Sequence, residues 1–301
     1  MSEWIFACLA PPGDGAREAL LLARSIRHFA GNRAGNPIWV LIPEAEDKLA
    51  PHIEADFRSL HVRLIPFALG EDAHTFPFAA KTLAAAEAEA LAEDQAPLLV
   101  WMDRDSIILQ EPGALRLPQD RVLGYRPVDH TLIGSLYDSP VDDFWQLVYS
   151  LCGVPAERLF PMIASVDEKR IRPYFNAGML VVRPERHLLR SWAGNFERLF
   201  LAPEFEPFYQ QDILYRIFMH QAILAGTILS ACDQDELYQL SHLINYPLHM
   251  HRSYPPDRRP ARMNDLISCR TDTLFQDPAW DADVVIDEPL RGWLNDQRAG
   301  L

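Results

Sequence analysis

The chain has 301 residues, 49% of them hydrophobic and 23% charged, a balance typical of a soluble globular protein. This length allows one large domain or two small ones, and either can bury a sizeable core. With 28 basic and 42 acidic residues the formal net charge is −14, which argues against nucleic acid and anionic membrane surfaces as general partners.

Strands and helices alternate over the first hundred residues. The predicted buried strands are Glu3–Leu9, Pro37–Pro43, Val62–Ala68 and Pro97–Met102. The first predicted helix has Asp14 as its N-cap and ends at Gly31. The second runs from Glu46 to Leu60, with Pro51 delaying or kinking its start, and the third spans Ala79–Glu93. This order predicts an α/β fold with a doubly wound, mostly parallel sheet.

The alternation becomes less regular after Asp105. The remaining predicted elements are strands at Arg121–Val128 and Tyr174–Arg183 and helices at Ser139–Cys152, 186–201 and 208–231. From Ser253 onward the chain is rich in Pro, Arg and Asp and has few periodic segments, so we expect an irregular carboxyl-terminal wrap or lid. The predicted division is therefore one domain over residues 1–252 and an extension, 253–301, packed on the same domain.

The amino terminus and the cysteines indicate a cytoplasmic protein. Glu3 precedes the apolar run Trp4–Ala10, whereas a secretory signal begins with basic residues and has a longer apolar core. No apolar run approaches the roughly 20 residues of a membrane span. The four cysteines form no metal-binding spacing and are expected to be small hydrophobic residues in a reducing compartment. Homo-oligomerisation is left open.

The most informative segment is Pro97–Leu109, in which six apolar residues are followed by Asp-Arg-Asp and then by further apolar residues. Such a run is typical of a buried parallel strand, and it delivers Asp103 and Asp105 to the carboxyl end of that strand, where open α/β sheets bind ligands. Two acids at this spacing can face one hard cation, which in turn bridges a diphosphate. The alternative is that both acids only cap the segment after the strand.

Two further groups carry polar chemistry near predicted strands. His249 and His251 share a face of extended backbone and can supply a nitrogen ligand to a metal already held by carboxylates, or they are surface histidines of a loop. Asn176 and Gly178 open the strand at Tyr174–Arg183, where a small residue allows a ligand to approach the backbone and an amide can bind sugar hydroxyls. A simple turn is the alternative there.

Lys81 is the one basic residue of the predicted helix Ala79–Glu93, whose other charged residues are acidic. Its ammonium group can reach a phosphate from the start of this helix. A solvated surface lysine is an equally good interpretation of the sequence alone.

The order of these motifs resembles that of the GT-A nucleotide-sugar glycosyltransferases, and within them glycosyltransferase family eight, which includes glycogenin-like and galactosyltransferase-like enzymes. The similarity is strongest at Trp101–Asp105, an aromatic residue followed by Asp-x-Asp, and at Phe175–Val182, a Phe-Asn-x-Gly sequence followed by aliphatic residues. A helix with His220-Gln221, then Asn245-Tyr246 and the late histidines, follow in the family's order. The resemblance implies a single Rossmann-like GT-A domain.

The resemblance also implies roles for individual residues. Asp103 and Asp105 would coordinate Mn²⁺ or Mg²⁺, with His249 or His251 completing the protein ligands. Asp103 would also touch the nucleotide ribose. The residues that would bind the donor or acceptor are Lys81, Asp103, Asn176, Gly178, Gln221 and Arg252.

Two departures from the family pattern concern the donor. The family's Asp-Gln pair is His220-Gln221 here, and its closing His-x-x-Gly-x-x-Lys-Pro-Trp is absent. The family lysine in that pattern grips the diphosphate, and Arg252 is the substitute that the sequence offers.

The function implied is a metal-dependent glycosyltransferase that moves a hexose from a nucleotide diphosphate sugar, with UDP favoured, to an unknown acceptor. One alternative is a catalytically inactive GT-A-like protein that binds a nucleotide sugar or a glycan. A sugar nucleotidyltransferase is a third, but Leu9–Gly15 lacks the glycine-rich loop with a basic residue that this class needs.

Overall fold

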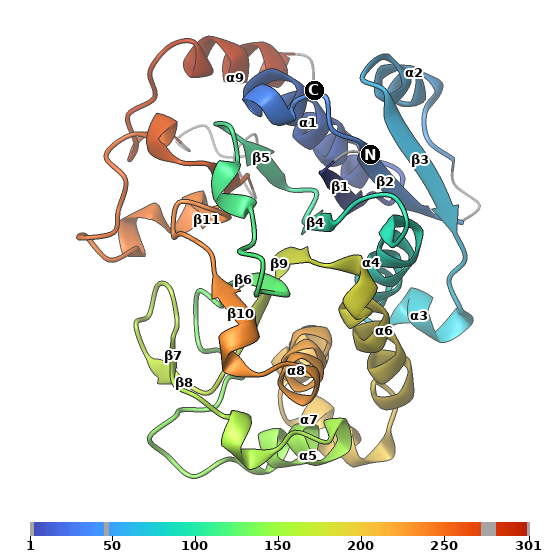
Figure 1. The fold of residues 1–301 in the computed structure, drawn as a ribbon, viewed down its shortest axis with the longest axis vertical. Helices are drawn as coiled ribbons and strands as arrows, with labels where there is room; N and C mark the ends of the chain where they lie inside the picture. The colour runs from blue at the N-terminus through green and yellow to red at the C-terminus, as the bar shows by residue number, and fades with distance from the viewer. Residues whose placement is uncertain (1–2, 45–47, 272–280, 300–301) are drawn as a thin grey trace.

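A seven-stranded sheet forms the centre of the molecule, with the strand order β10-β6-β9-β4-β1-β2-β3 (Figure 1). The computed structural model describes residues 3–44, 48–271 and 281–299. In the order of the sheet the strands are Leu237–Gln239, Leu123–Pro127, Phe175–Val182, Leu98–Met102, Trp4–Leu9, Ile38–Pro43 and Val62–Phe67. All run in one direction except β9, so the predicted α/β fold with a mostly parallel central sheet is confirmed.

Helices cover both faces of the sheet, which is why its strands are nearly continuous apolar runs. The helices are α1 (Asp14–Phe29) and α2 (Pro51–Ser59) on one face and α4 (Ala79–Ala92), α6 (Leu188–Leu199) and α8 (Ile213–Ala231) on the other. Successive side chains of a strand point to opposite faces. In β1, Ile5 and Ala7 join the core beneath α4, while Trp4 and Phe6 join the core beneath α1.

The direction of β9 is the main feature that the sequence pattern does not contain, because a strand buried on both faces looks the same whichever way it runs. β9 pairs antiparallel with both β4 and β6. The connection over residues 128–174, which includes α5 (Asp143–Cys152), therefore begins and ends at the same edge of the sheet. As a result β9 begins beside the carboxyl ends of β4 and β6.

Several element ends differ from the sequence prediction. Asp14 is the first residue of α1 and not its N-cap, since Gly13, with φ of 83°, precedes the helix. Helix α2 begins only at Pro51, which suits the first helical position, and residues 45–47 of the predicted helix lie outside the described residues. The predicted helix over 208–231 is divided at Asp212 into α7 (Glu206–Gln211) and α8, and the Asp212 side chain accepts a hydrogen bond from the Leu214 amide.

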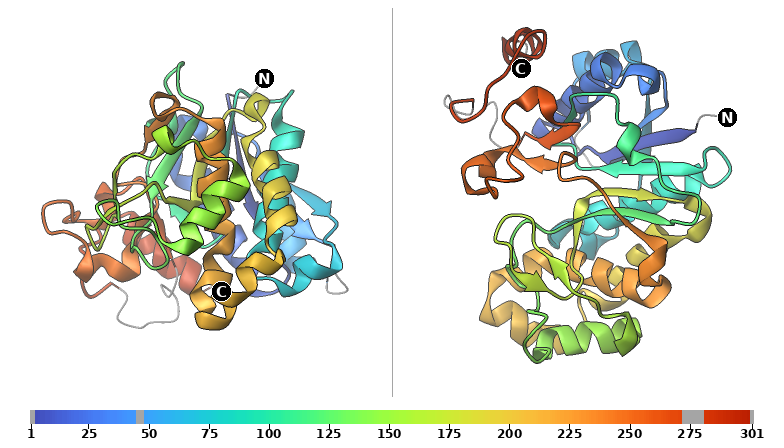
Figure 2. Two further views of the ribbon diagram at one scale, coloured as in Figure 1. Left: turned by 90° about the horizontal axis from the view of Figure 1, so that it is seen from below. Right: turned by 60° about the vertical axis from the view of Figure 1, so that its left-hand side comes forward.

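The carboxyl-terminal segment carries more regular structure than its composition indicates. β12 (Ser268–Arg270) pairs with β5 (Ser106–Ile108) and β11 (Tyr246–Pro247) in a second, three-stranded sheet. Helix α9 (Leu290–Ala299) was not predicted; it lies along α1 (Figures 1 and 2), where the Trp293 ring contacts Phe29 at 5.1 Å between centroids. The remaining elements are α3 (Glu71–Thr75), β7 (Met162–Ile163) and β8 (Arg170–Ile171).

Helix α8 is a core helix. By length and composition alone it is apolar enough to cross a membrane, a possibility that the sequence analysis did not identify. Its residues from Met219 to Leu229 are buried, and it packs against α5, α6, α7 and β9.

Glu89, in the middle of the alanine-rich helix α4, fixes α6 in place. It is fully buried, and its two carboxylate oxygens accept hydrogen bonds from the backbone amides of Leu189 and Arg190, at 3.0 and 2.8 Å. These amides belong to the first turn of α6, whose N–H groups have no partner within the helix. Burial raises the pKa of Glu89, and the two amides and the Arg190 guanidinium oppose that shift.

We expect Glu89→Ala to lower the free energy of unfolding by about 2–4 kcal/mol, because it leaves two helix-terminal amides buried without an acceptor. Urea denaturation measures the change. Glu87→Ala on the exposed side of the same helix is the matched control and should change stability by less than about 0.5 kcal/mol. Equal effects of the two substitutions would contradict the role of Glu89.

Candidate functional site

A pocket of about 320 Å³ lies at the carboxyl ends of β4 and β6, beside the start of β9. It is lined by six residues that the sequence analysis selected: Lys81, Asp103, Asp105, Asn176, Gly178 and Gln221. It is also lined by residues that were not selected, among them Phe78, Asp129, His130, Leu132, His220, Met250 and Arg270. The two motifs identified in the sequence therefore meet in one cavity, as expected for the carboxyl edge of a mostly parallel sheet.

A tight turn directs both acids of the Asp-x-Asp motif to the pocket. The Asp103 amide donates to the Gly178 carbonyl at 2.8 Å, which extends the pairing of β4 with β9 by one residue. The Ser106 amide then donates to the Asp103 carbonyl at 3.2 Å and closes the turn. Arg104, between the acids, points away from the pocket and forms an ion pair of 2.7 Å with Glu18 of α1.

Lys81 forms an ion pair with the first acid and is not a solvated surface lysine. Its Nζ lies 2.7 Å from Asp103 Oδ1 and 2.9 Å from Oδ2, and only 10% of the lysine side chain is exposed. Helix α4 begins just before Lys81, so this one ion pair joins the start of α4 to the end of β4.

The side chains of Asn176 and Gln221 are bound to the backbone at the start of β9, beside the pocket. Asn176 Oδ1 accepts a hydrogen bond from the Gly178 amide at 2.8 Å, and Gln221 Oε1 accepts one from the Ala177 amide at 3.2 Å. Asn245 donates to Asn176 Oδ1 from behind, at 3.4 Å. The side-chain oxygens of Asn176 and Gln221 are thus occupied by backbone amides of β9. Their side-chain NH₂ groups are the donors that these residues can offer to a ligand.

Arg270 is a basic residue of the pocket that the sequence analysis did not select. It comes from β12, where it pairs with Ser106 directly after the two acids, and it forms an ion pair of 2.6 Å with Asp129. Both side chains line the pocket. No local pattern in the sequence marks Arg270, because its place depends on a pairing between strands more than 150 residues apart; one available signal was a basic residue ending a short apolar stretch in an otherwise irregular segment.

The late basic residues that the sequence analysis selected are not among those that line the pocket. His251 is buried, and its Nδ1 lies 2.9 Å from the Tyr246 hydroxyl. His249 is exposed on the same short helical segment, Leu248–Ser253. The Arg252 side chain is 77% exposed and pairs with Asp283 at 2.5 Å. From this segment Met250 is the residue that lines the pocket.

The pocket offers oxygen ligands suited to a divalent cation. Asp103 and Asp105 both line it, and Mg²⁺ is commonly bound through one or two carboxylates together with substrate phosphates. An ionised carboxylate has about four lone-pair sites, so Asp103 can accept Lys81 and still face a cation. Within residues 3–44, 48–271 and 281–299 no group of three or more His, Cys, Asp or Glu side chains is gathered for metal binding. The histidine ligand implied by the resemblance thus stays a prediction.

His220 supplies a neutral imidazole to the pocket. Burial lowers its pKa well below the usual 6.5, and the nearby charge of Lys81 lowers it further. Its Nδ1 lies 3.0 Å from the Ile217 carbonyl, an acceptor, so Nδ1 carries the proton. Phe78 stacks on this ring at 4.5 Å; it is 46% exposed and has a left-handed backbone with φ of 60°, a conformation that bulky residues rarely adopt.

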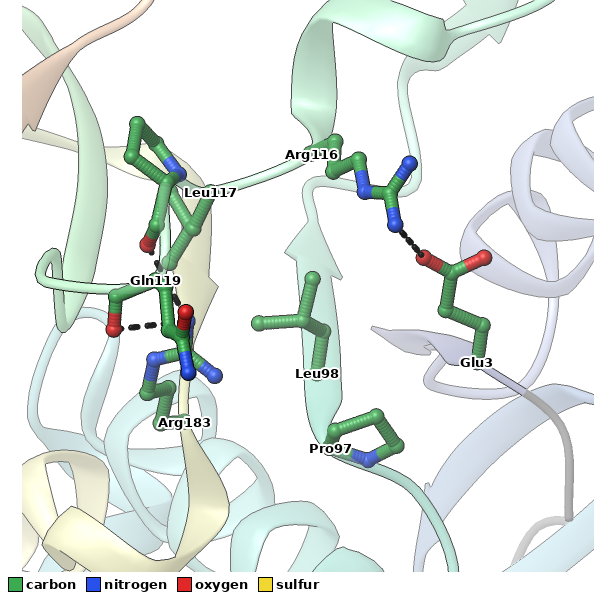
Figure 3. A pocket seen from close by; sticks show the side chains of 8 residues that line it. Glu3, Pro97, Leu98, Arg116, Leu117, Gln119 and Arg183 are labelled. Carbon is green, nitrogen blue, oxygen red and sulfur yellow. Dashed lines mark hydrogen bonds and ion pairs between the residues drawn. The ribbon is translucent and has the colours of Figure 1, made fainter.

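A second pocket, of about 490 Å³, lies at the amino end of β4 and is shown in Figure 3. Its charged side chains already have protein partners: Glu3 pairs with Arg33 and Arg116, and Arg183 donates to the carbonyl of Arg121. It also lies at the edge of the sheet where open α/β folds do not bind ligands. We therefore assign function to the pocket around Asp103.

Comparisons with known proteins identify the family. A model of the Rhodobacterales glycosyltransferase domain matches residues 6–227, well over half of the chain. The chain belongs to this glycosyltransferase family. The matched region contains Lys81, Asp103, Asp105 and Asn176 and ends before Arg270. No curated protein matches this glycosyltransferase in sequence.

Its fold is similar to that of the galactosyltransferase LgtC. The structure of LgtC in complex with donor and acceptor sugar analogues aligns with a TM-score of 0.51 and 14% identity, over 99% of this chain and 96% of that one. An active-site mutant of LgtC aligns with a TM-score of 0.50 and 13% identity, over 88% and 86%. At this identity the likeness concerns the GT-A fold alone.

Gly178 is required for space in this glycosyltransferase. A Cβ atom there would lie 2.5 Å from Asp103 Oδ2 and 3.0 Å from Asn176 Oδ1, and Lys81 holds the Asp103 carboxylate in place. We expect Gly178→Ala to lower the free energy of unfolding by about 1–3 kcal/mol. Gly194→Ala, in α6 with open space around its Cβ, should instead raise it by up to about 1 kcal/mol. A stabilising Gly178→Ala would show that the Asp103 side chain moves freely.

The buried neutral His220 makes stability depend on pH. Its native pKa is lowered, so below about pH 6.5 the unfolded chain binds a proton that the native protein does not, and the native state loses stability as the pH falls. For this one group the loss approaches about 1.4 kcal/mol per pH unit. Urea denaturation between pH 7 and pH 5 should show a shallower decline for His220→Gln, and an unchanged one for the exposed control His52→Gln. Identical slopes for wild type and His220→Gln would refute it.

Proposed function

We propose that this glycosyltransferase moves a hexose from a nucleotide diphosphate sugar, with UDP as the favoured nucleotide, in a reaction that depends on Mn²⁺ or Mg²⁺. The observation that carries the proposal is the convergence of Asp103, Asp105 and Lys81 with Asn176 and Gln221 in one pocket at the carboxyl edge of the sheet. A sugar nucleotide requires three kinds of group: acids that hold a divalent cation, positive charge that binds its phosphates, and amides that bind its hydroxyls.

Different residues of the pocket would bind different parts of the donor. Asp103 and Asp105 would hold the cation, which supplies charge neutralisation for a leaving diphosphate. Lys81 keeps Asp103 oriented and places a positive charge beside the same phosphates. Asn176 and Gln221 offer amide donors to hydroxyl groups of the sugar. Gly178, which the sequence analysis expected to leave room for a ligand, leaves room for the Asp103 carboxylate beside the backbone of β9.

Arg270 takes the diphosphate-binding role that the sequence analysis assigned to Arg252. The Arg252 side chain is exposed and paired with Asp283, while Arg270 lines the same pocket as Asp103 and Asp105. Guanidinium groups bind phosphate oxygens through two parallel hydrogen bonds. We propose that Arg270 provides the positive charge that is missing from the carboxyl-terminal motif of this chain.

The sugar and the closer family are proposed from similarity. LgtC is a galactosyltransferase that binds donor and acceptor sugar analogues, and its fold aligns with nearly the whole chain. Together with the sequence patterns around Trp101–Asp105 and Phe175–Val182, this supports a hexose donor and a glycosyltransferase family eight origin. The exposed side chains of Phe78 and Leu132 at the pocket provide apolar surface on which the ring of an acceptor sugar can stack.

Binding of UDP should require the cation and both acids. We expect UDP with Mn²⁺, at a hundred times the dissociation constant, to stabilise the folded protein by about 2.7 kcal/mol. In the wild type, a chelator should remove the metal-dependent part of this stabilisation. The variants Asp103→Asn and Asp105→Asn should lack that part, as measured by thermal unfolding. Release of UDP from a panel of UDP-hexoses then tests transfer or hydrolysis. If UDP stabilises the protein equally in the presence of Mn²⁺ and of chelator, metal dependence is overturned. Lys81 and Arg270 would then supply the positive charge alone.

The roles of Arg270 and Arg252 can be separated by substitution. Arg270→Gln with Asp129→Asn removes the ion pair without leaving an unpaired acid, and it should weaken UDP binding about tenfold or more, since one charge-assisted hydrogen bond contributes about 1.5–3 kcal/mol. Arg252→Gln should change UDP binding less than about twofold. Titration calorimetry measures both, and the reverse order would restore the assignment made from sequence.

A further inference from the structure

A third cavity, of about 670 Å³, lies beside β6 and β10, and its lining shares no residue with the pocket around Asp103. Its most unusual feature is Arg126, the fourth residue of β6, which lines the cavity although it is only 4% exposed, and whose guanidinium donates to two other lining residues, Leu240 and Ser165. Buried arginines are normally paired with an acid, because an isolated charge is costly to remove from water.

Arg126 has neutral hydrogen-bond partners only. Its guanidinium donates to the Leu240 carbonyl at 3.1 Å, to Ser165 Oγ at 3.2 Å and to the Tyr254 hydroxyl at 3.2 Å. Among the residues that the structure describes, no carboxylate lies within ion-pair distance of it. The acid whose charge reaches Arg126, Asp129, is already paired with Arg270 at 2.6 Å. The positive charge of Arg126 is thus held in place by the protein and is not neutralised by it.

The other titratable groups of the lining do not neutralise Arg126. Arg258 lines the same cavity and pairs with Glu168, which lines it too, at 2.9 Å. His242 lines it as well, and its pKa is lowered by burial and then by the charges of Arg126 and Arg258. Because Arg258 and Glu168 neutralise each other and the lowered pKa favours the neutral form of His242, Arg126 carries the unbalanced positive charge of this lining.

The rest of the lining suits a polar ligand with an apolar ring face. Gln234, Gln239 and Ser241 offer amide and hydroxyl groups that bind hydroxyls, and Phe160 and Tyr125 offer aromatic surface. A guanidinium held by three hydrogen bonds is already oriented. Binding of an oxyanion therefore costs little side-chain entropy, and more of the interaction free energy remains as affinity.

We propose that this cavity is an anion-binding site, separate from the pocket around Asp103, which takes the carboxylate or phosphate group of a hydroxylated ligand such as an acidic sugar or a sugar phosphate. Arg126 binds the oxyanion at the base of the cavity and Arg258 assists from its side. The proposal does not depend on which nucleotide sugar the enzyme uses.

Titration calorimetry with inorganic phosphate and with glucuronate, at constant ionic strength, tests the site. We expect both anions to bind the full-length protein. The anion with the higher affinity shows whether the natural ligand carries a phosphate or a carboxylate group. Arg126→Gln should weaken binding at least tenfold. Because Arg126 is buried, circular dichroism and thermal unfolding must first show that this variant is folded.

Arg258→Gln provides a second variant that is safer for the fold, since its side chain is 31% exposed, and it should weaken binding severalfold. Arg262→Gln is the matched control, because Arg262 also forms an exposed ion pair, with Asp287, but lies outside the cavity. Anion binding that survives both Arg126→Gln and Arg258→Gln would overturn the proposal. So would an equal loss with Arg262→Gln, or displacement of phosphate by UDP, which would place the anion in the other pocket.

Discussion

The pairing of β9 against β4 is the constraint on which the site depends. Because the two strands run in opposite directions, β9 starts where β4 ends, and the last hydrogen bond between them joins Asp103 to Gly178. A parallel β9 would place Asn176 and Gly178 at the opposite edge of the sheet, away from the acids. One reversed strand in a mostly parallel sheet thus turns two separate sequence motifs into the two walls of one pocket.

The electrostatics of the pocket follow from this arrangement. The chain carries a large excess of acids, yet Asp103 and Asp129, which follow β4 and β6 and line the pocket, each have a cation beside them. Lys81 pairs with Asp103 and Arg270 pairs with Asp129, and these cations come from distant parts of the chain. The pocket therefore presents both acids and cations, a combination suited to a ligand that brings both phosphate groups and a divalent cation.

The sequence predicted the fold and part of the pocket, for identifiable reasons. An apolar run that ends in acids specifies both a buried strand and the edge where it ends, so Asp103 and Asp105 were found from local pattern, while Lys81, Asn176 and Gln221 owed their selection mainly to the family resemblance. Arg270 was missed because its position depends on pairing between β5 and β12, which no local pattern records. Arg252 was chosen by its place after the histidines, but the short helical segment Leu248–Ser253 directs Met250 to the pocket and leaves Arg252 at the surface.

Thr271, the residue after Arg270, donates to the Asp105 carbonyl through its hydroxyl at 2.8 Å and also through its amide. The turn that presents the two acids is therefore fastened by a segment near the end of the chain. During synthesis every strand of the central sheet is translated before this fastening exists, so the sheet can form while the pocket is still open on one side. Arg270 and Thr271 follow all seven strands in the chain, so the charge arrangement of the pocket can be completed only after the whole sequence of the sheet has been translated.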